Sequence, residues 1–85
     1  MNQSIIFTDQ LFIEQDRVRF IAQQQGVNIN CYVSFTAMGQ LCEQQGINQF
    51  NAADVFEFCR FDIEDKAEAL IGQESFNDNG DIELY

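Results

Sequence analysis

The chain contains no histidine, no proline and no tryptophan among its 85 residues. Without histidine it lacks the commonest general base and the commonest metal ligand in proteins. Without proline, no ring interrupts a helix or removes a hydrogen-bond donor from a strand. Basic residues are also scarce, since four of them stand against fourteen acidic residues for a formal net charge of −10. These absences exclude histidine-dependent chemistry and disfavour polyanionic ligands.

The acidic charge bears directly on the kind of partner. Nucleic acids and anionic lipids are bound by displacing counterions with lysine and arginine, so we expect no nucleic-acid partner and no membrane partner. No apolar run approaches the roughly 20 residues of a membrane span. The N-terminal residues Met1–Phe7 carry no basic region and no apolar core of an export signal, which predicts a cytoplasmic protein.

Cysteine is present but not in a recognisable pattern. Cys31, Cys42 and Cys59 are odd in number and widely spaced, which predicts neither a disulfide framework nor a zinc site. Each stands among apolar neighbours, where cysteine usually behaves as a small buried hydrophobe. In a reducing compartment we expect all three thiols to be reduced and buried.

The length and the hydrophobic share of 46% suit a single domain, residues 1–85. Its first part alternates like β structure. Ser4–Phe7 is β-like, Asp9-Gln10 is typical of a turn, and the state of the apolar run Leu11–Ile13 stays open. No internal repeat, linker or low-complexity segment divides the chain.

A β-hairpin is the clearest local signal. The apolar residues of one face are expected to pair with each other, which favours Ala22 opposite Val27, Phe20 opposite Ile29 and Val18 opposite Cys31. The connection is then residues 23–26, with Gly26 free to take a positive φ. The opposite face is polar and meets water; it carries Arg17, Arg19, Asn28, Asn30 and Tyr32.

Two helices are expected after the hairpin. Ser34 is a candidate N-cap for a helix over Phe35–Gln45, with Gly46 just beyond its end. Asn48 or Asn51 begins a second helix that runs to about Gly72. One narrow apolar stripe follows this second helix, with acidic residues opposite; it contains Ala52, Val55, Phe56, Cys59, Ile63, Ala67 and Leu70.

The end of the sequence is expected to return to β structure. Asn77–Gly80 is typical of a turn, and Asp81–Tyr85 alternates as a last strand. The predicted fold class is therefore α+β: a small antiparallel sheet, made of the β-hairpin plus N- and C-terminal strands, with two helices packed on one face.

Several short segments together resemble a known family. They are Met1-Asn2-Gln3 with Ile5, Phe7 and Asp9, then Val18-x-Phe20, Gly26, Cys31-x-Val33-Ser34, Arg60-x-Asp62-Ile63-Glu64 and Ala67-Glu68-x-Leu70-Ile71. In this order they resemble the small gamma-proteobacterial proteins catalogued as domain of unknown function 1488. The resemblance spans nearly the whole chain. It implies a compact α+β fold and no established activity.

Carboxylates are the remaining candidates for chemistry. Glu57, Glu64 and Glu68 lie on one side of the second predicted helix, although such faces are normally just solvated. Arg60 is expected to pair with Glu57 and Glu64 at i−3 and i+4. The segment Ser75–Ile82 partly imitates a calcium loop but lacks the glutamate required at its twelfth position. We therefore predict no catalytic, cofactor-binding or metal-binding residues.

Two aromatic residues do not fit the apolar stripe. On a straight helix Phe61 points away from the core, and Phe58 also lies beside the stripe; either the helix bends, or another element covers the rings, or a partner does. The predicted interaction surface is Phe58, Phe61, Glu57, Arg60, Glu64, Asp65 and Glu68. The leading interpretation is a non-catalytic binding or accessory protein that acts through protein–protein contact, with an unknown protein partner or by self-association. The alternative is a carboxylate-based enzyme, with a divalent cation supplied by its substrate.

Overall fold

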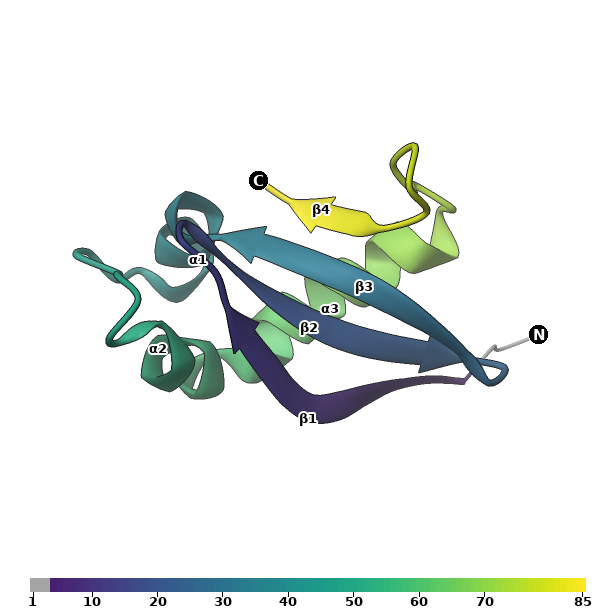
Figure 1. Ribbon diagram of the computed structural model, residues 1–85, viewed down its shortest axis with the longest axis horizontal. Coiled ribbons are helices and arrows are strands. Elements are labelled where there is room, and N and C mark those ends of the chain that lie inside the picture. Colours follow the sequence, from purple (N-terminus) through teal and green to yellow (C-terminus); the bar gives the residue numbers. More distant parts are fainter. Residues whose placement is uncertain (1–3) are drawn as a thin grey trace.

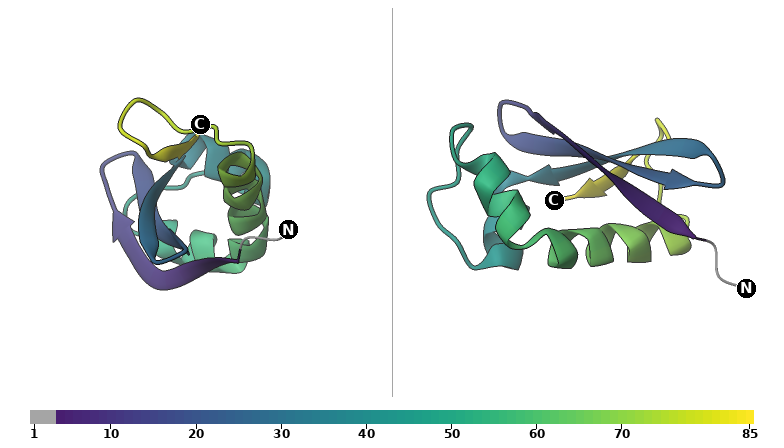
Figure 2. Two further views of the ribbon diagram at one scale, coloured as in Figure 1. Left: turned by 90° about the vertical axis from the view of Figure 1, so that its right-hand side faces the viewer. Right: turned by 90° about the horizontal axis from the view of Figure 1, so that it is seen from below.

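The computed structural model describes residues 4–85, which form four strands and three helices (Figure 1). The sheet has the order β1-β2-β3-β4, and the helices lie on one side of it (Figure 2). The α+β class predicted from the sequence is confirmed. In chain order the elements are β1 Ile5–Ile13, β2 Arg17–Gln24, β3 Val27–Ser34, α1 Phe35–Cys42, α2 Ala52–Phe58, α3 Arg60–Gly72 and β4 Ile82–Leu84.

The hairpin of β2 and β3 buries the predicted face in a different register. Phe20 lies opposite Cys31 and Ala22 opposite Ile29, so the predicted pairing was wrong by two residues. The connection is the two-residue turn Gln25-Gly26, with φ of 53° and 79°. Two positive φ values are typical of the type I′ turn, whose twist matches that of the strands. A shift of two residues leaves each side chain on its predicted face.

β1 joins two segments that the sequence left separate. The predicted turn at Asp9-Gln10 is instead an irregularity inside one strand, because Phe7 pairs with Ala22 whereas Leu11 pairs with Phe20. Extra residues on one strand bend it and increase its twist. Leu11–Ile13, whose state the sequence left open, therefore belongs to the edge strand.

β4 runs parallel to β3, with Cys31 beside Ile82 and Val33 beside Leu84. The predicted last strand is thus confirmed in position, but its antiparallel direction was wrong. The three helices lie between the two strands in sequence and carry the chain back, as parallel pairing requires.

α1 begins as predicted and ends earlier. The Ser34 hydroxyl accepts a hydrogen bond from the Ala37 amide at 3.0 Å, which confirms the N-cap. The helix stops at Cys42 rather than Gln45 because Glu43 takes a left-handed φ of 54°. The chain then folds tightly over Gly39, where a Cβ would lie 2.9 Å from the Gln44 carbonyl oxygen.

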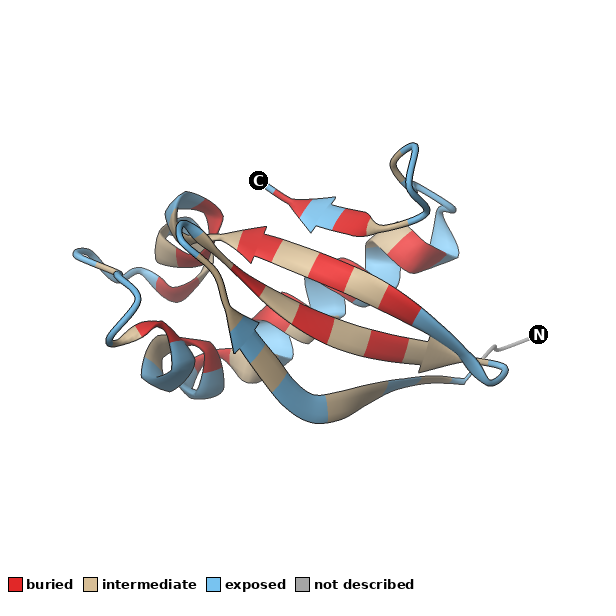
Figure 3. Cartoon of the chain, in the orientation of Figure 1, coloured by how far each residue is buried: buried red, intermediate tan, exposed pale blue. Residues whose placement is uncertain are grey.

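The second predicted helix is divided at Cys59, whose φ of −124° and ψ of 34° are not helical. α2 and α3 nevertheless both bury residues of their apolar stripe, and these positions are red in Figure 3. The largest fully buried side chains come from both layers and are Phe20, Phe56, Met38, Ile63, Ile82, Val18, Val33 and Cys31. One core therefore holds the strands and helices together.

Candidate interaction surface

Phe58 and Phe61 stand on either side of the break at Cys59. Phe58 is the last residue of α2 and Phe61 the second residue of α3. Their exposed fractions are 75% and 78%, whereas Phe56, two residues before Phe58, is fully buried. The helix does bend here, as one of the sequence alternatives required, but the bend leaves both rings in solvent.

Arg60 connects the two helices across the break. Its Nε donates to Glu57 Oε1 at 2.9 Å, its Nη2 donates to the second Glu57 oxygen, and its Nη1 donates to Glu64 Oε2 at 3.0 Å. The predicted pairing of Arg60 with both glutamates is confirmed. The guanidinium carbon also lies 5.2 Å from the ring centroid of the buried Phe56.

Arg60 and Glu64 are largely buried, whereas Glu57 is about half exposed. The side chains of Arg60 and Glu64 are 17% and 15% exposed, and that of Glu57 is 55% exposed. The hydrogen bonds from Arg60 hold the pKa of Glu57 below its usual range, and they raise the pKa of Arg60. Both members of the bidentate pair are therefore charged at neutral pH.

The two remaining predicted residues, Asp65 and Glu68, are exposed on α3. They follow Phe61 at i+4 and i+7, so the three positions share one face of the helix. The structure thus brings the predicted residues together on the outer side of the α2–α3 junction. We call this set of seven residues the aromatic–acidic surface: Phe58, Phe61, Glu57, Arg60, Glu64, Asp65 and Glu68.

Sequence reasoning missed the most exposed of the large apolar side chains in residues 4–85. Phe50, in the loop before α2, is 96% exposed. Asn48 Oδ1 accepts from the amides of Phe50 and Asn51, and Asn51 Oδ1 accepts from the amide of Asn48. The pair of asparagines three residues apart was a signal for such a turn. Phe50 lies at the opposite end of α2 from Phe58.

An arginine cluster on the open face of the sheet was also missed. Arg17 contacts three residues: its Nε lies 2.6 Å from Glu14 Oε1, its Nη1 donates to the Tyr85 hydroxyl at 2.7 Å, and its Cζ stacks 3.9 Å from the Tyr32 ring centroid. The hydrogen bond to Glu14 raises the pKa of Arg17. A hollow beside this cluster is lined by Glu14, Gln15, Asp16, Arg17, Ser34, Thr36 and Tyr85.

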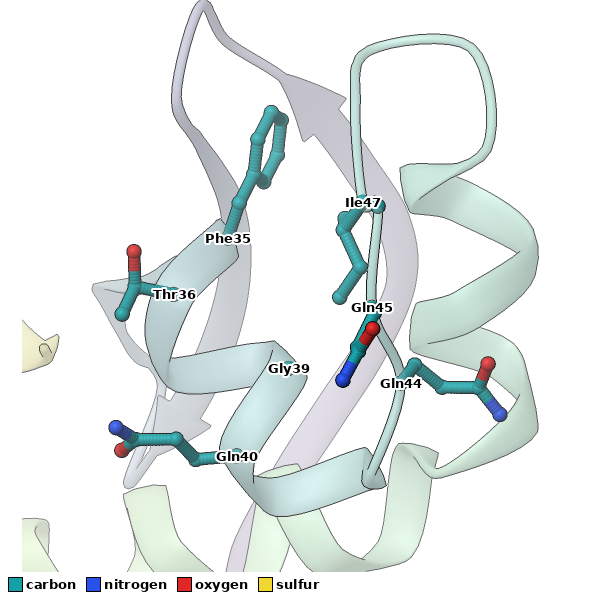
Figure 4. A pocket seen from close by; sticks show the side chains of 8 residues that line it. Phe35, Thr36, Gly39, Gln40, Gln44, Gln45 and Ile47 are labelled. Carbon is teal, nitrogen blue, oxygen red and sulfur yellow. The ribbon is translucent and has the colours of Figure 1, made fainter.

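A second hollow lies between α1 and the loop that follows it. Figure 4 shows Phe35 on the helix and Ile47 on the loop, with Gly39 between them. Its volume is about 470 Å³, and its remaining walls carry mostly glutamine amides. It contains none of the predicted interaction residues and no ionisable side chain.

The carboxylates of residues 4–85 do not form a metal-binding site. Across residues 4–85, no group of three or more histidine, cysteine, aspartate or glutamate side chains gathers closely enough to hold a metal ion. Glu57 and Glu64 instead share one arginine. In the same described part of the chain, none of the helices has the length and apolar character of a membrane span.

The cysteines depart from expectation in one respect. All three are buried, as predicted, but Cys42 and Cys59 form a disulfide, so the prediction of three reduced thiols was wrong. The end of α1 and the break between α2 and α3 bring their Cα atoms to 5.7 Å, within the range a disulfide spans. Cys31 is free, and burial raises the pKa of its thiol to about 12.

Comparison with known proteins gives two matches. Residues 5–84 match the model of a family described as "Protein of unknown function (DUF1488)". The crystal structure of a protein of unknown function from that family, from Shewanella loihica PV-4, is similar at 44% sequence identity and a TM-score of 0.89. The match covers 99% of this chain and 94% of that one. Among curated proteins, none matches the chain.

Proposed function

Because the chain belongs to the DUF1488 family, whose description names no activity, we propose a function from its surface: non-catalytic binding of a basic protein partner through Phe58 and Phe61. The observation that carries this proposal is the exposure of both rings, at 75% and 78%, at the junction that Arg60 bridges by hydrogen bonds to Glu57 and Glu64. Aromatic side chains of this kind are the usual anchors of protein interfaces.

Phe58 and Phe61 leave most of their apolar surface in contact with water. Fully burying one phenylalanine side chain contributes roughly 1.5–3 kcal/mol, and the fold obtains only a small part of this from Phe58 or Phe61, which are 75% and 78% exposed. The bidentate pair of Arg60 with Glu57 joins a side chain of α2 to one of α3 beside both rings. A partner that covers the rings would therefore also meet this charged pair.

Charge indicates the chemistry of the partner. Asp65 and Glu68 share one face of α3 with Phe61, on a molecule whose net charge is −10. A partner with lysine or arginine around an apolar pocket would be attracted over distance and held at the rim. Self-association is disfavoured because two such surfaces would repel one another. The same negative charge would repel nucleic acids and anionic membrane surfaces, so neither is proposed as a partner.

The alternative, a carboxylate-based enzyme, receives no support from a specific contact. A general acid at neutral pH needs a raised pKa, whereas Arg60 lowers the pKa of Glu57. Glu64 is committed to the same arginine at 3.0 Å. The cytoplasmic location expected from the sequence stays a prediction and forms part of the binding proposal.

The proposal is tested by variant-dependent capture. Tagged wild-type protein and the double variant Phe58→Ala/Phe61→Ala are incubated with native cell extract, and the captured proteins are identified by mass spectrometry. A captured protein is then purified and its Kd is measured. We expect a basic protein whose Kd rises at least about 10-fold in the double variant, since losing two anchors exceeds 1.4 kcal/mol.

Phe50→Ala is the matched control, because it removes an even more exposed phenylalanine ring outside the aromatic–acidic surface. It should leave the Kd unchanged. An unchanged Kd in the double variant, with the fold intact, would refute the proposal; so would an acidic partner whose binding does not weaken with added salt.

A further inference from the structure

The disulfide lies at the one residue where the long predicted helix is interrupted. Cys59 ends α2 and begins α3, and its sulfur is bonded to that of Cys42 at the end of α1. Phe58 and Phe61 flank this residue. A covalent bond between two distant segments thus coincides with the junction that presents both exposed rings.

The local sequence does not itself call for a break. From Ala52 to Ile71 there is no glycine and no proline, and the apolar stripe passes through position 59 at helical spacing. Backbone bonding is helical on both sides, because the Cys59 amide donates to the Val55 carbonyl and the Ile63 amide donates to the Cys59 carbonyl, each at 3.2 Å. The interruption is therefore a distortion of a single residue, not a loop.

We propose that Cys42 and Cys59 form a reversible redox site that sets the relative orientation of Phe58 and Phe61; this inference rests on the binding function proposed above. In the oxidised protein the disulfide holds Cys59 out of helical geometry and interrupts the helix between Phe58 and Arg60. In the reduced protein α2 continues into α3. The two rings then lie three residues apart on one helix, as direct neighbours.

The exchange balances with a dithiol reductant. One thiolate of the reductant attacks a sulfur of the Cys42–Cys59 bond, and its second thiol resolves the mixed disulfide. Two electrons and two protons pass to Cys42 and Cys59, and the reductant leaves as a disulfide. Cys59 Sγ already lies 3.6 Å from the Val55 carbonyl oxygen, so the reduced thiol has an acceptor in place. In the reducing compartment that the sequence predicts, a disulfide of this transient kind is the usual one.

Amide hydrogen exchange tests the inference on the whole protein, with dithiothreitol as the reductant. In the oxidised form the amides of Arg60 and Asp62 should exchange rapidly, because helical bonding is interrupted beside them. After reduction both amides should slow at least about 10-fold, helical ellipticity should increase, and reoxidation should restore the first pattern. Equal exchange in both forms, or cooperative unfolding on reduction, would overturn the proposal.

Two variants serve as controls. Cys42→Ala cannot form the bond and should show the reduced pattern with or without dithiothreitol; Cys31→Ala keeps the bond and should respond as the wild type does. If Cys42→Ala fails to fold, reduction of the wild-type protein still decides the question. Exchange requires no partner, so it fails or succeeds independently of the Kd measured for Phe58→Ala/Phe61→Ala.

Discussion

The ring of Phe56 on α2 meets the ring of Phe20 on β2 edge to face, with centroids 5.1 Å apart and planes inclined by 62°. Phe7 on β1 contacts Phe20 as well, at 6.1 Å. This stack joins the helical layer to two strands. Phe7, Phe20 and Phe56 thus help to hold the fold together. Phe58 and Phe61 take no part in this stack and are exposed.

Phe56→Ala should therefore lower the free energy of unfolding by about 3–5 kcal/mol, the usual cost of truncating a buried aromatic ring. Phe58→Ala and Phe61→Ala should each change it by less than about 0.5 kcal/mol, because surface substitutions rarely do more. Urea unfolding followed by circular dichroism measures all three. A loss of several kcal/mol in Phe61→Ala would show that this ring is structural and would contradict the binding proposal.

Gly39→Ala should be destabilising although alanine favours helices. The added Cβ would lie 2.9 Å from the Gln44 carbonyl oxygen, and backbone must move to make room, at about 1–3 kcal/mol. Gly72→Ala is the control, since nothing lies within 4 Å of its added Cβ. There the greater helix propensity of alanine should raise the free energy of unfolding by up to about 1 kcal/mol.

Substitutions at the two adjacent residues of the hairpin turn should change the stability of the protein in opposite directions. Gly26→Ala should destabilise by about 1 kcal/mol, because φ at this position is 79° and alanine adopts it poorly. Gln25→Asn should stabilise slightly, since asparagine tolerates the φ of 53° better than glutamine. Thermal melting of the two variants compares them directly. Equal melting temperatures would argue against the type I′ turn.

Counting thiols tests the cysteine assignment. The native protein should show no rapid reaction with a thiol reagent, because Cys42 and Cys59 are bonded and burial raises the pKa of Cys31 to about 12. Unfolding without reductant should release one thiol, that of Cys31. Unfolding with reductant should release all three. Three reactive thiols after unfolding the air-oxidised protein in the absence of reductant would disprove the disulfide.

Glu57 should titrate below an ordinary glutamate, whose pKa is about 4.3, because Arg60 stabilises its charged form. Since folding lowers this pKa, the pair stabilises the protein above about pH 4.3 and the contribution is lost as the pH falls through the folded value. In Arg60→Gln the pKa of Glu57, followed by NMR, should return to the ordinary range. Glu68→Gln should leave it in place; a low value that persists in Arg60→Gln would contradict the assignment.

The strand faces could be predicted from the sequence, but the hairpin register could not. Alternation places Phe20 and Ile29 on the buried face for every register that differs by an even number of residues. Periodicity therefore does not determine which of these registers the strands adopt. The register depends on the turn, and Gln25 is not a residue type that indicates a positive φ. Because position 25 carries no glycine, asparagine or aspartate, the residues of the turn did not indicate the two-residue connection.

The helix break and the disulfide could not be predicted from the sequence for a related reason. The apolar stripe from Ala52 to Leu70 is continuous in sequence, and the constraint that interrupts it comes from Cys42, seventeen residues before Cys59. The candidate surface, in contrast, followed from local spacing, because Phe58 and Phe61 do not fit the stripe. What lies close along the helix could be predicted, whereas contacts between separate elements could not.

The parallel pairing of β4 with β3 has a consequence for how the molecule assembles. The β2–β3 hairpin closes a two-residue loop, whereas joining Ile82 to Cys31 must first order the whole segment that includes α1, α2 and α3. The entropy of closing so long a segment delays this step relative to the hairpin. Until β4 arrives, β3 presents an unpaired edge to which the strand of another molecule could add. The nascent fold is therefore most vulnerable to misassembly on the side of the sheet away from β1.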